Sequence, residues 1–218
     1  MQPADDPSCD YKDLVRRGYD ACAQAYADVR APRLPHEAHQ LMARLPDRAR
    51  VLDIGCGSGK PLTAALAQRF IVTGIDISAE QVRLARSMHP TVDFIGADIM
   101  SARFESASFE AVVSLYTIFH IPREEHEELF RRIRHWLMPT GYLLASVATH
   151  EEAPYLEDDF FGVRMYWSNW GLGDYRGMLA RVGFDVLSVT TTGHGYGADQ
   201  AADTEAHPLI FAQRRSGT

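Results

Sequence analysis

The sequence predicts a single α/β domain built on a doubly wound, mixed sheet with helices on both faces. Three observations support this prediction. Short apolar runs alternate with segments of helical periodicity along most of the chain. The apolar run at 50–54 leads into glycines at alternate positions, as a buried strand does where it enters a ligand-binding turn. A length of 218 residues with 46% hydrophobic content suits one buried core and is short for two.

The amino-terminal part is expected to be helical. Residues 11–27 lack proline and carry apolar side chains at helical spacing, and a second helical pattern runs to about residue 45. A strand at 50–54, a helix face from residue 62 and a strand at 71–77 follow in β-α-β order.

The S-x-x-Q sequence that starts at Ser78 resembles a capping box, which predicts a helix beginning there. Asp76 is thereby placed at the carboxyl end of the strand before it. This position matters for function because ligands of open α/β sheets bind beside the carboxyl ends of the strands.

The rest of the chain supplies the remaining strands, which are expected at 91–95, 110–115, 142–148, 184–191 and 208–213. They bring the predicted sheet to seven strands, and the last is expected to run antiparallel. Helices are expected at 123–138 and 173–183, the first with acidic residues early and arginines late, which complements the helix dipole.

Two stretches have no clear periodicity. Residues 149–173 concentrate aromatic side chains, and we expect an irregular insertion over the ligand. Residues 193–203 have the composition of an exposed loop.

Composition excludes several classes of protein. A net charge of −7 disfavours proteins that hold nucleic acid by neutralising phosphates. The three cysteines lack the spacing of a zinc site or a disulfide framework, and the nine histidines form no recognisable ligand set, so we predict no metal. The first ten residues do not resemble a signal peptide, and no apolar run reaches the ~20 residues that span a bilayer, so we expect a cytoplasmic protein without a membrane partner.

The glycine turn itself distinguishes between nucleotide-binding classes. A P-loop would need glycine at position 54 and Ser or Thr at 61, but the chain has Ile54 and Pro61. A dinucleotide turn would need a third glycine at position 60, where the chain has Lys60, and this disfavours a dinucleotide-dependent oxidoreductase.

The turn does match the pattern Asp-x-Gly-x-Gly-x-Gly over residues 53–59, followed by Gly-Ile-Asp-Ile-Ser at 74–78 and Gly-Ala-Asp-Ile at 96–99. In these motifs and their order the chain resembles the class I S-adenosylmethionine-dependent methyltransferases, over roughly residues 14–215. Thr140 stands where the family more often has glycine. The resemblance implies a Rossmann-like fold, S-adenosylmethionine as cofactor, and in-line transfer of a methyl group to an O, N or S nucleophile of a small molecule.

The resemblance also implies roles for residues at the strand ends. Asp76 would accept the ribose hydroxyls rather than only cap a helix, since Ser78 already offers that cap. Asp98 would accept from the adenine amino group or else serve only as a turn residue, and Asp53 would face turn amides or the amino-acid end of the cofactor. The residues expected to hold the cofactor are Tyr26, Asp53, Gly55, Cys56, Gly57, Asp76, Ile77, Ala97, Asp98, Ile99 and Leu115.

The acceptor is expected beyond the fourth strand. His120 is the candidate general base, with a histidine merely bonded in the wall as an equally weighted alternative. Tyr116 is expected to contact the sulfonium or the substrate. The aromatic stretch is expected either to line the acceptor pocket or to form a small satellite core. Its candidate substrate-binding residues are His150, Tyr166, Trp167 and Trp170.

The resemblance divides the single domain into a helical lid at 1–45, a cofactor-binding core at 46–148, a substrate-side insertion at 149–173 and a carboxyl-terminal part at 174–218. Residues 114–117 lack both the acid of metal-dependent relatives and the Asn/Asp-Pro-Pro-aromatic motif of base-modifying relatives. A small-molecule acceptor is therefore favoured over nucleic acid. A non-catalytic cofactor-binding module and a methyltransferase acting on protein or tRNA stay open as alternatives, and the oligomeric state is not predicted.

Overall fold

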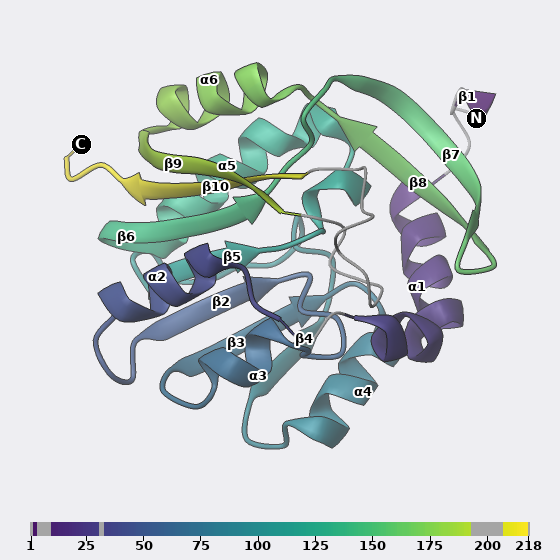
Figure 1. Cartoon of the computed structure of the whole chain (residues 1–218), viewed down its shortest axis with the longest axis horizontal. Coiled ribbons are helices and arrows are strands. Elements are labelled where there is room, and N and C mark those ends of the chain that lie inside the picture. Colours follow the sequence, from purple (N-terminus) through teal and green to yellow (C-terminus); the bar gives the residue numbers. More distant parts are fainter. Residues whose placement is uncertain (1, 4–9, 31–32, 193–206, 218) are drawn as a thin grey trace.

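The structure, a computed structural model of the whole chain, describes residues 2–3, 10–30, 33–192 and 207–217. A seven-stranded sheet forms its centre, in the order β4-β3-β2-β5-β6-β10-β9 (Figure 1). In this sheet β10 runs antiparallel to both of its neighbours, β6 and β9, and all other neighbouring pairs are parallel, which confirms the predicted mixed, doubly wound architecture. The strands are β2 (Arg50–Ile54), β3 (Ile71–Asp76), β4 (Asp93–Gly96), β5 (Phe109–Ser114), β6 (Leu137–Ser146), β9 (Phe184–Thr192) and β10 (His207–Arg214).

Helices cover both faces of this sheet (Figure 1). Alternation along β2 explains why both faces are apolar: Leu52 and Ile54 pack in one core cluster, whereas Val51 packs in the other. The first cluster includes α5 (His126–Trp136) and α6 (Leu172–Val182), and the second includes α2 (His36–Arg44) and α3 (Leu62–Leu66). The remaining helices are α1 (Tyr11–Val29), α4 (Ala79–Met88) and two short 3₁₀ helices, η1 (Ile118–His120) and η2 (Arg123–Glu125).

The stretch at 149–173 is regular, so the expectation of an irregular insertion is wrong. It forms an antiparallel hairpin of β7 (Glu152–Phe160) and β8 (Val163–Asn169), which pairs with β1 (Gln2–Pro3) in a second sheet. Phe161 and Gly162 both have positive φ at the turn, as the tightest hairpin connections require. Successive residues of β8, such as Met165 and Tyr166, are both buried, and this hides the alternation that marks a strand.

The structure also differs from the sequence prediction at the end of one helix. The helix predicted at 123–138 ends at Trp136, and β6 begins at Leu137, because the chain enters the sheet directly and pairs Leu137 with Phe109 across an irregularity in register. The loop predicted at 193–203 lies outside the described residues. Within the described part of the chain, every helix is too short or too polar to cross a bilayer.

Candidate active site

A cavity lies beside the carboxyl ends of β2, β3, β4 and β5, with α1 along its other side, and its empty space, including the part open to solvent, is about 880 Å³. In the sheet order, β2 lies between β3 and β5, and connections leave it in both directions. Such a topological switch point is where open α/β sheets bind ligands.

The cavity gathers the residues that the sequence selected as cofactor-binding, with the exception of Asp53, together with Tyr116 and His120. Several other residues of the wall were not predicted, and they are Lys12, Val15, Arg30, Ser58, Lys60, Gln81, Thr117 and Ile121. The placement of the predicted residues follows from their position at strand ends. Among the others, Ser58 and Lys60 belong to the glycine turn, and the rest lie on or directly beside α1, α4 and η1, whose approach to the sheet no local motif indicates.

The glycine turn after β2 is shaped by close backbone contact. Gly55 has φ +69°, and a Cβ there would lie 1.9 Å from Thr117 Oγ1. Its amide donates to the Ile75 carbonyl at 2.8 Å. Only glycine fits this position without strain or displacement of Thr117.

Asp76 lies at the end of β3, as predicted, and is held by the backbone. Its carboxylate accepts from the amides of Gly57 at 2.8 Å and Ser78 at 2.9 Å. The Ser78 hydroxyl accepts from the Gln81 amide at 3.1 Å, which confirms the predicted helix cap. Burial raises the pKa of Asp76 to about 6, although the two amides act in the opposite direction.

Asp53 is not bonded to the turn amides but accepts from the Thr63 hydroxyl on α3 at 2.6 Å. Burial raises its pKa to about 7, against the effect of this hydrogen bond. Asp53 borders a second cavity, of about 640 Å³, whose wall also contains Arg30, Arg33 and Lys60. No local sequence pattern indicates Thr63 as its partner.

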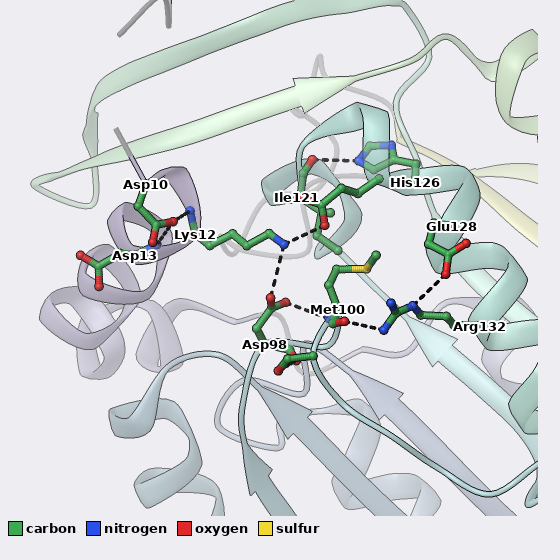
Figure 2. A network of polar contacts seen from close by, with 11 residues as sticks. Asp10, Lys12, Asp13, Asp98, Met100, Ile121, His126, Glu128 and Arg132 are labelled. Carbon is green, nitrogen blue, oxygen red and sulfur yellow. Dashed lines mark hydrogen bonds and ion pairs between the residues drawn. The ribbon is translucent and has the colours of Figure 1, made fainter. Parts of the chain in front are cut away.

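Asp98 makes the contact expected of a turn residue, while its role toward adenine stays a prediction. Its Oδ1 accepts from the Met100 amide at 2.9 Å, as in a turn, while its Oδ2 lies 3.4 Å from Lys12 Nζ (Figure 2). Lys12 also donates to Glu125 at 2.7 Å. Although burial works in the opposite direction, these two acids raise the pKa of Lys12. Lys12 thus joins α1 to the turn after β4 and to the start of α5.

Gln81 of α4 is a polar residue that the sequence did not select. Its side chain is 1% exposed and borders the cavity. Neither its amide oxygen nor its amide nitrogen has a hydrogen-bond partner among the described residues. Buried amides in native proteins are nearly always bonded, so this side chain is a candidate to bond a polar ligand in the cavity.

His120 lies in the cavity wall on η1 and is 7% exposed. Its Nδ1 is 2.9 Å from the Tyr166 carbonyl oxygen, and its Nε2 is 2.8 Å from the Tyr19 hydroxyl. Burial lowers the pKa of His120 to about 4, against the effect of the Tyr166 carbonyl, so the ring is neutral at pH 7. Both ring nitrogens are therefore engaged within the protein, with Nε2 bonded to Tyr19, which also borders the cavity. The role of His120 as a general base stays a prediction.

Tyr116 has an unusual backbone, with φ +58°, which for a bulky residue is strained and typical of functional positions. Its amide donates to Ser146 Oγ at 2.6 Å, and its hydroxyl lies 3.2 Å from Thr192 Oγ1. The Arg30 guanidinium lies 4.8 Å from its ring centroid. The ring is thus fixed at the edge of the cavity beside a cation.

The four candidate substrate-binding residues do not border this cavity. Tyr166 is buried and stacks on Tyr11 at 4.3 Å, and the Trp170 indole donates to the Arg123 carbonyl at 2.7 Å. Trp167 packs against the His120 ring with centroids 4.3 Å apart, and His150 is exposed. Packing of β8 on α1 and η1 explains the positions of Tyr166 and Trp167, and substrate contact by all four residues stays a prediction.

Within the described part of the chain, no group of three His, Cys, Asp or Glu side chains is placed to hold a metal ion.

Comparison with known proteins agrees with this geometry. A family model described as "Methyltransferase domain" matches residues 51–141. The chain is 40% identical over 113 residues to 27-O-demethylrifamycin SV methyltransferase of Amycolatopsis mediterranei, covering 48% of this chain and 41% of that protein. It is 37% identical over 123 residues to trans-aconitate 2-methyltransferase of Paracidovorax citrulli, covering 54% and 46%. The chain therefore spans less than half the length of these two curated relatives.

Among solved structures, the fold is similar to that of Burkholderia thailandensis 1,6-didemethyltoxoflavin-N1-methyltransferase, which was solved with 1,6-didemethyltoxoflavin and S-adenosylhomocysteine bound. The TM-score is 0.73 at 19% identity, and the match covers 98% of this chain and 94% of that one. Over residues 51–141 the chain is thus similar to a methyltransferase domain, and its strand order and glycine turn agree with the resemblance to the class I S-adenosylmethionine-dependent methyltransferases.

Proposed function

We propose that this protein binds S-adenosylmethionine in the 880 Å³ cavity and transfers its methyl group to an O, N or S nucleophile of a small molecule. The observation that carries the proposal is the shared wall of the cavity. There the glycine turn, Asp76 and Asp98 lie together with the unpartnered amide of Gln81.

The residues present fit the cofactor. Each Asp76 oxygen accepts one amide and has capacity to accept from a ribose hydroxyl. Asp98 borders the cavity at the turn after β4, and its carboxylate, which also pairs with Lys12, has lone pairs to accept from an adenine amino group, while Ile77 and Ile99 offer apolar walls for the ring. Gln81 adds one donor and one acceptor that lack partners among the described residues.

When bound, S-adenosylmethionine would supply an electrophilic methyl group on its sulfonium sulfur. The chain's own contribution is to align the reactants and to exclude water, which are large effects in bimolecular transfers. Tyr116 and His120, at the end of β5, border the part of the cavity where an acceptor would approach. Tyr116 is held there by Ser146 and Thr192.

A small-molecule acceptor is supported by three points. The net charge of −7 opposes binding to nucleic acid. The two curated relatives are named for a demethylrifamycin and for trans-aconitate, and the solved relative holds a demethyltoxoflavin. The wall is mixed, with apolar residues such as Val15 and Ile121 beside polar ones, which is typical of small-ligand sites.

Calorimetric titration tests the cofactor, with S-adenosylhomocysteine and NADH as competing choices. We expect tight binding of the first, no binding of the second, and loss of at least tenfold in affinity in Asp76→Ala. Tight binding of NADH alone would overturn the proposal.

Methyl transfer is tested by incubating the protein with labelled cofactor and a panel of small molecules, and by measuring release of S-adenosylhomocysteine and of labelled product. Cofactor binding with labelled protein or tRNA as the only product would favour the alternative acceptors.

A further inference from the structure

The hydrogen bond between Tyr19 and His120 has a defined direction. The Tyr166 carbonyl oxygen can only accept, so the Nδ1 of His120, 2.9 Å away, must carry a proton. A neutral imidazole then has no proton on Nε2, which must accept. The Tyr19 hydroxyl, 2.8 Å from Nε2, is therefore the donor.

This direction determines what the Tyr19 oxygen can do next. The hydroxyl donates its single proton to His120, and no other hydrogen bond to this hydroxyl occurs among the described residues. Tyr19 borders the cavity, and its oxygen retains lone pairs. Toward a ligand it can accept a hydrogen bond but cannot donate one.

The surroundings keep the pair in this state. The rings of Tyr26 and Phe160 contact the Tyr19 ring at 5.4 Å and 5.9 Å between centroids, and Trp167 packs on His120. These aromatic neighbours fix both rings by packing. Burial holds the pKa of the Tyr19 phenol well above its usual value, so the hydroxyl stays neutral.

We infer that the acceptor presents a hydroxyl or an N–H group to Tyr19, and that Tyr19 and His120 together receive its proton. This inference rests on the proposed methyl transfer. A carboxylate acceptor has no proton to donate, and its oxygen would face the Tyr19 lone pairs without a hydrogen bond. The chain would therefore differ in acceptor chemistry from a relative that methylates trans-aconitate.

The proposed transfer forms one bond to the methyl carbon, breaks one, and moves two protons. The acceptor oxygen or nitrogen forms a bond to the methyl carbon while the carbon–sulfur bond breaks and leaves its electron pair on sulfur. The acceptor proton moves to the Tyr19 oxygen, and the Tyr19 proton moves to Nε2 of His120. The resulting imidazolium keeps its Nδ1 hydrogen bond to the Tyr166 carbonyl and later releases its proton to water.

The hydrogen-bond direction is testable without any acceptor. In ¹⁵N-labelled, ligand-free protein at pH 7, the His120 signals should show a neutral ring with the proton on Nδ1. Tyr19→Phe should move the Nε2 signal toward that of an unbonded nitrogen, whereas Tyr26→Phe, which removes a hydroxyl from the same helix, should leave it unchanged. A proton on Nε2, or a charged ring, would overturn the inference.

Acceptor chemistry is tested with a matched set of 2-naphthol, 2-naphthylamine and 2-naphthoate, plus trans-aconitate. We expect transfer only to hydroxyl and amine probes, and a kcat about 10²-fold lower in Tyr19→Phe, the usual size of a lost general-base step. In the same variant the Kd for S-adenosylhomocysteine should stay within twofold of the wild-type value.

Transfer to either carboxylate at an equal rate, or full kcat in Tyr19→Phe, would refute the inference and leave methyl transfer itself intact. A protein that binds no cofactor would instead refute the proposed function, and the ¹⁵N spectrum would still decide the hydrogen-bond direction.

Discussion

Replacing Gln81 by leucine should stabilise the ligand-free protein and weaken cofactor binding at the same time. The side chain is 1% exposed and both of its amide atoms lack partners among the described residues. An unsatisfied buried polar group costs roughly 1–3 kcal/mol. Leucine has a similar size and no polar atoms, so Gln81→Leu should remove at least one such penalty.

The expected size of each effect follows from these values. A gain of about 1–3 kcal/mol in the free energy of unfolding corresponds to a rise of roughly 2–12 °C in Tm for a chain of this length. Loss of one neutral hydrogen bond to the cofactor, at about 0.5–1.5 kcal/mol, weakens its Kd roughly 2- to 12-fold.

Thermal unfolding of the ligand-free protein and calorimetry with S-adenosylhomocysteine measure the two effects. Gln68→Leu is the matched control, since Gln68 is exposed and its replacement should change stability by less than about 0.5 kcal/mol. A lower Tm with unchanged affinity in Gln81→Leu would show that the amide is satisfied within the protein and would remove this support for the ligand site.

Three further predictions concern other walls of the cavity. Affinity for S-adenosylhomocysteine should be full above pH 6 and fall by up to about tenfold per unit below it, because the ligand prefers ionised Asp76, whose pKa in the free protein is raised to about 6. Asp76→Asn should flatten this dependence in calorimetry from pH 5 to 8, and a flat wild-type profile would contradict the assignment. Gly55→Ala should destabilise the fold by about 1–3 kcal/mol in urea unfolding, since its Cβ would meet Thr117 at 1.9 Å; an unchanged midpoint would refute the clash. Lys12→Gln should cost less than about 1 kcal/mol in the same assay, because Lys12, Asp98 and Glu125 are each about a third exposed, and a loss above about 2 kcal/mol would contradict this.

The cofactor half of the site could be predicted because its determinants are local. The Ser78 cap fixes where β3 ends, and that boundary places Asp76 at the cavity. The glycine turn and the turn after β4 are likewise encoded within a few consecutive residues. Such short-range patterns can be recognised in a single sequence.

The remaining contacts could not be predicted because they join distant segments. Tyr19 and His120 are 101 positions apart, and Lys12 reaches Asp98 only because α1 packs across the ends of the strands. The hairpin of β7 and β8 was missed for a related reason. Its strand β8 is covered by α1 on one side and η1 on the other, so burial does not alternate along it.

The two sheets of the structure are separate hydrogen-bonded units. The family match covers residues 51–141, whereas α1 and the β7–β8 hairpin lie outside it. The hairpin pairs with β1 rather than with any strand of the main sheet. Its sequence can therefore diverge without breaking a hydrogen bond of the main sheet, so under the proposed function the acceptor side can change while the glycine turn and the strand ends stay the same. Identity to a relative, when it is confined to the cofactor half, thus carries little information about which molecule receives the methyl group.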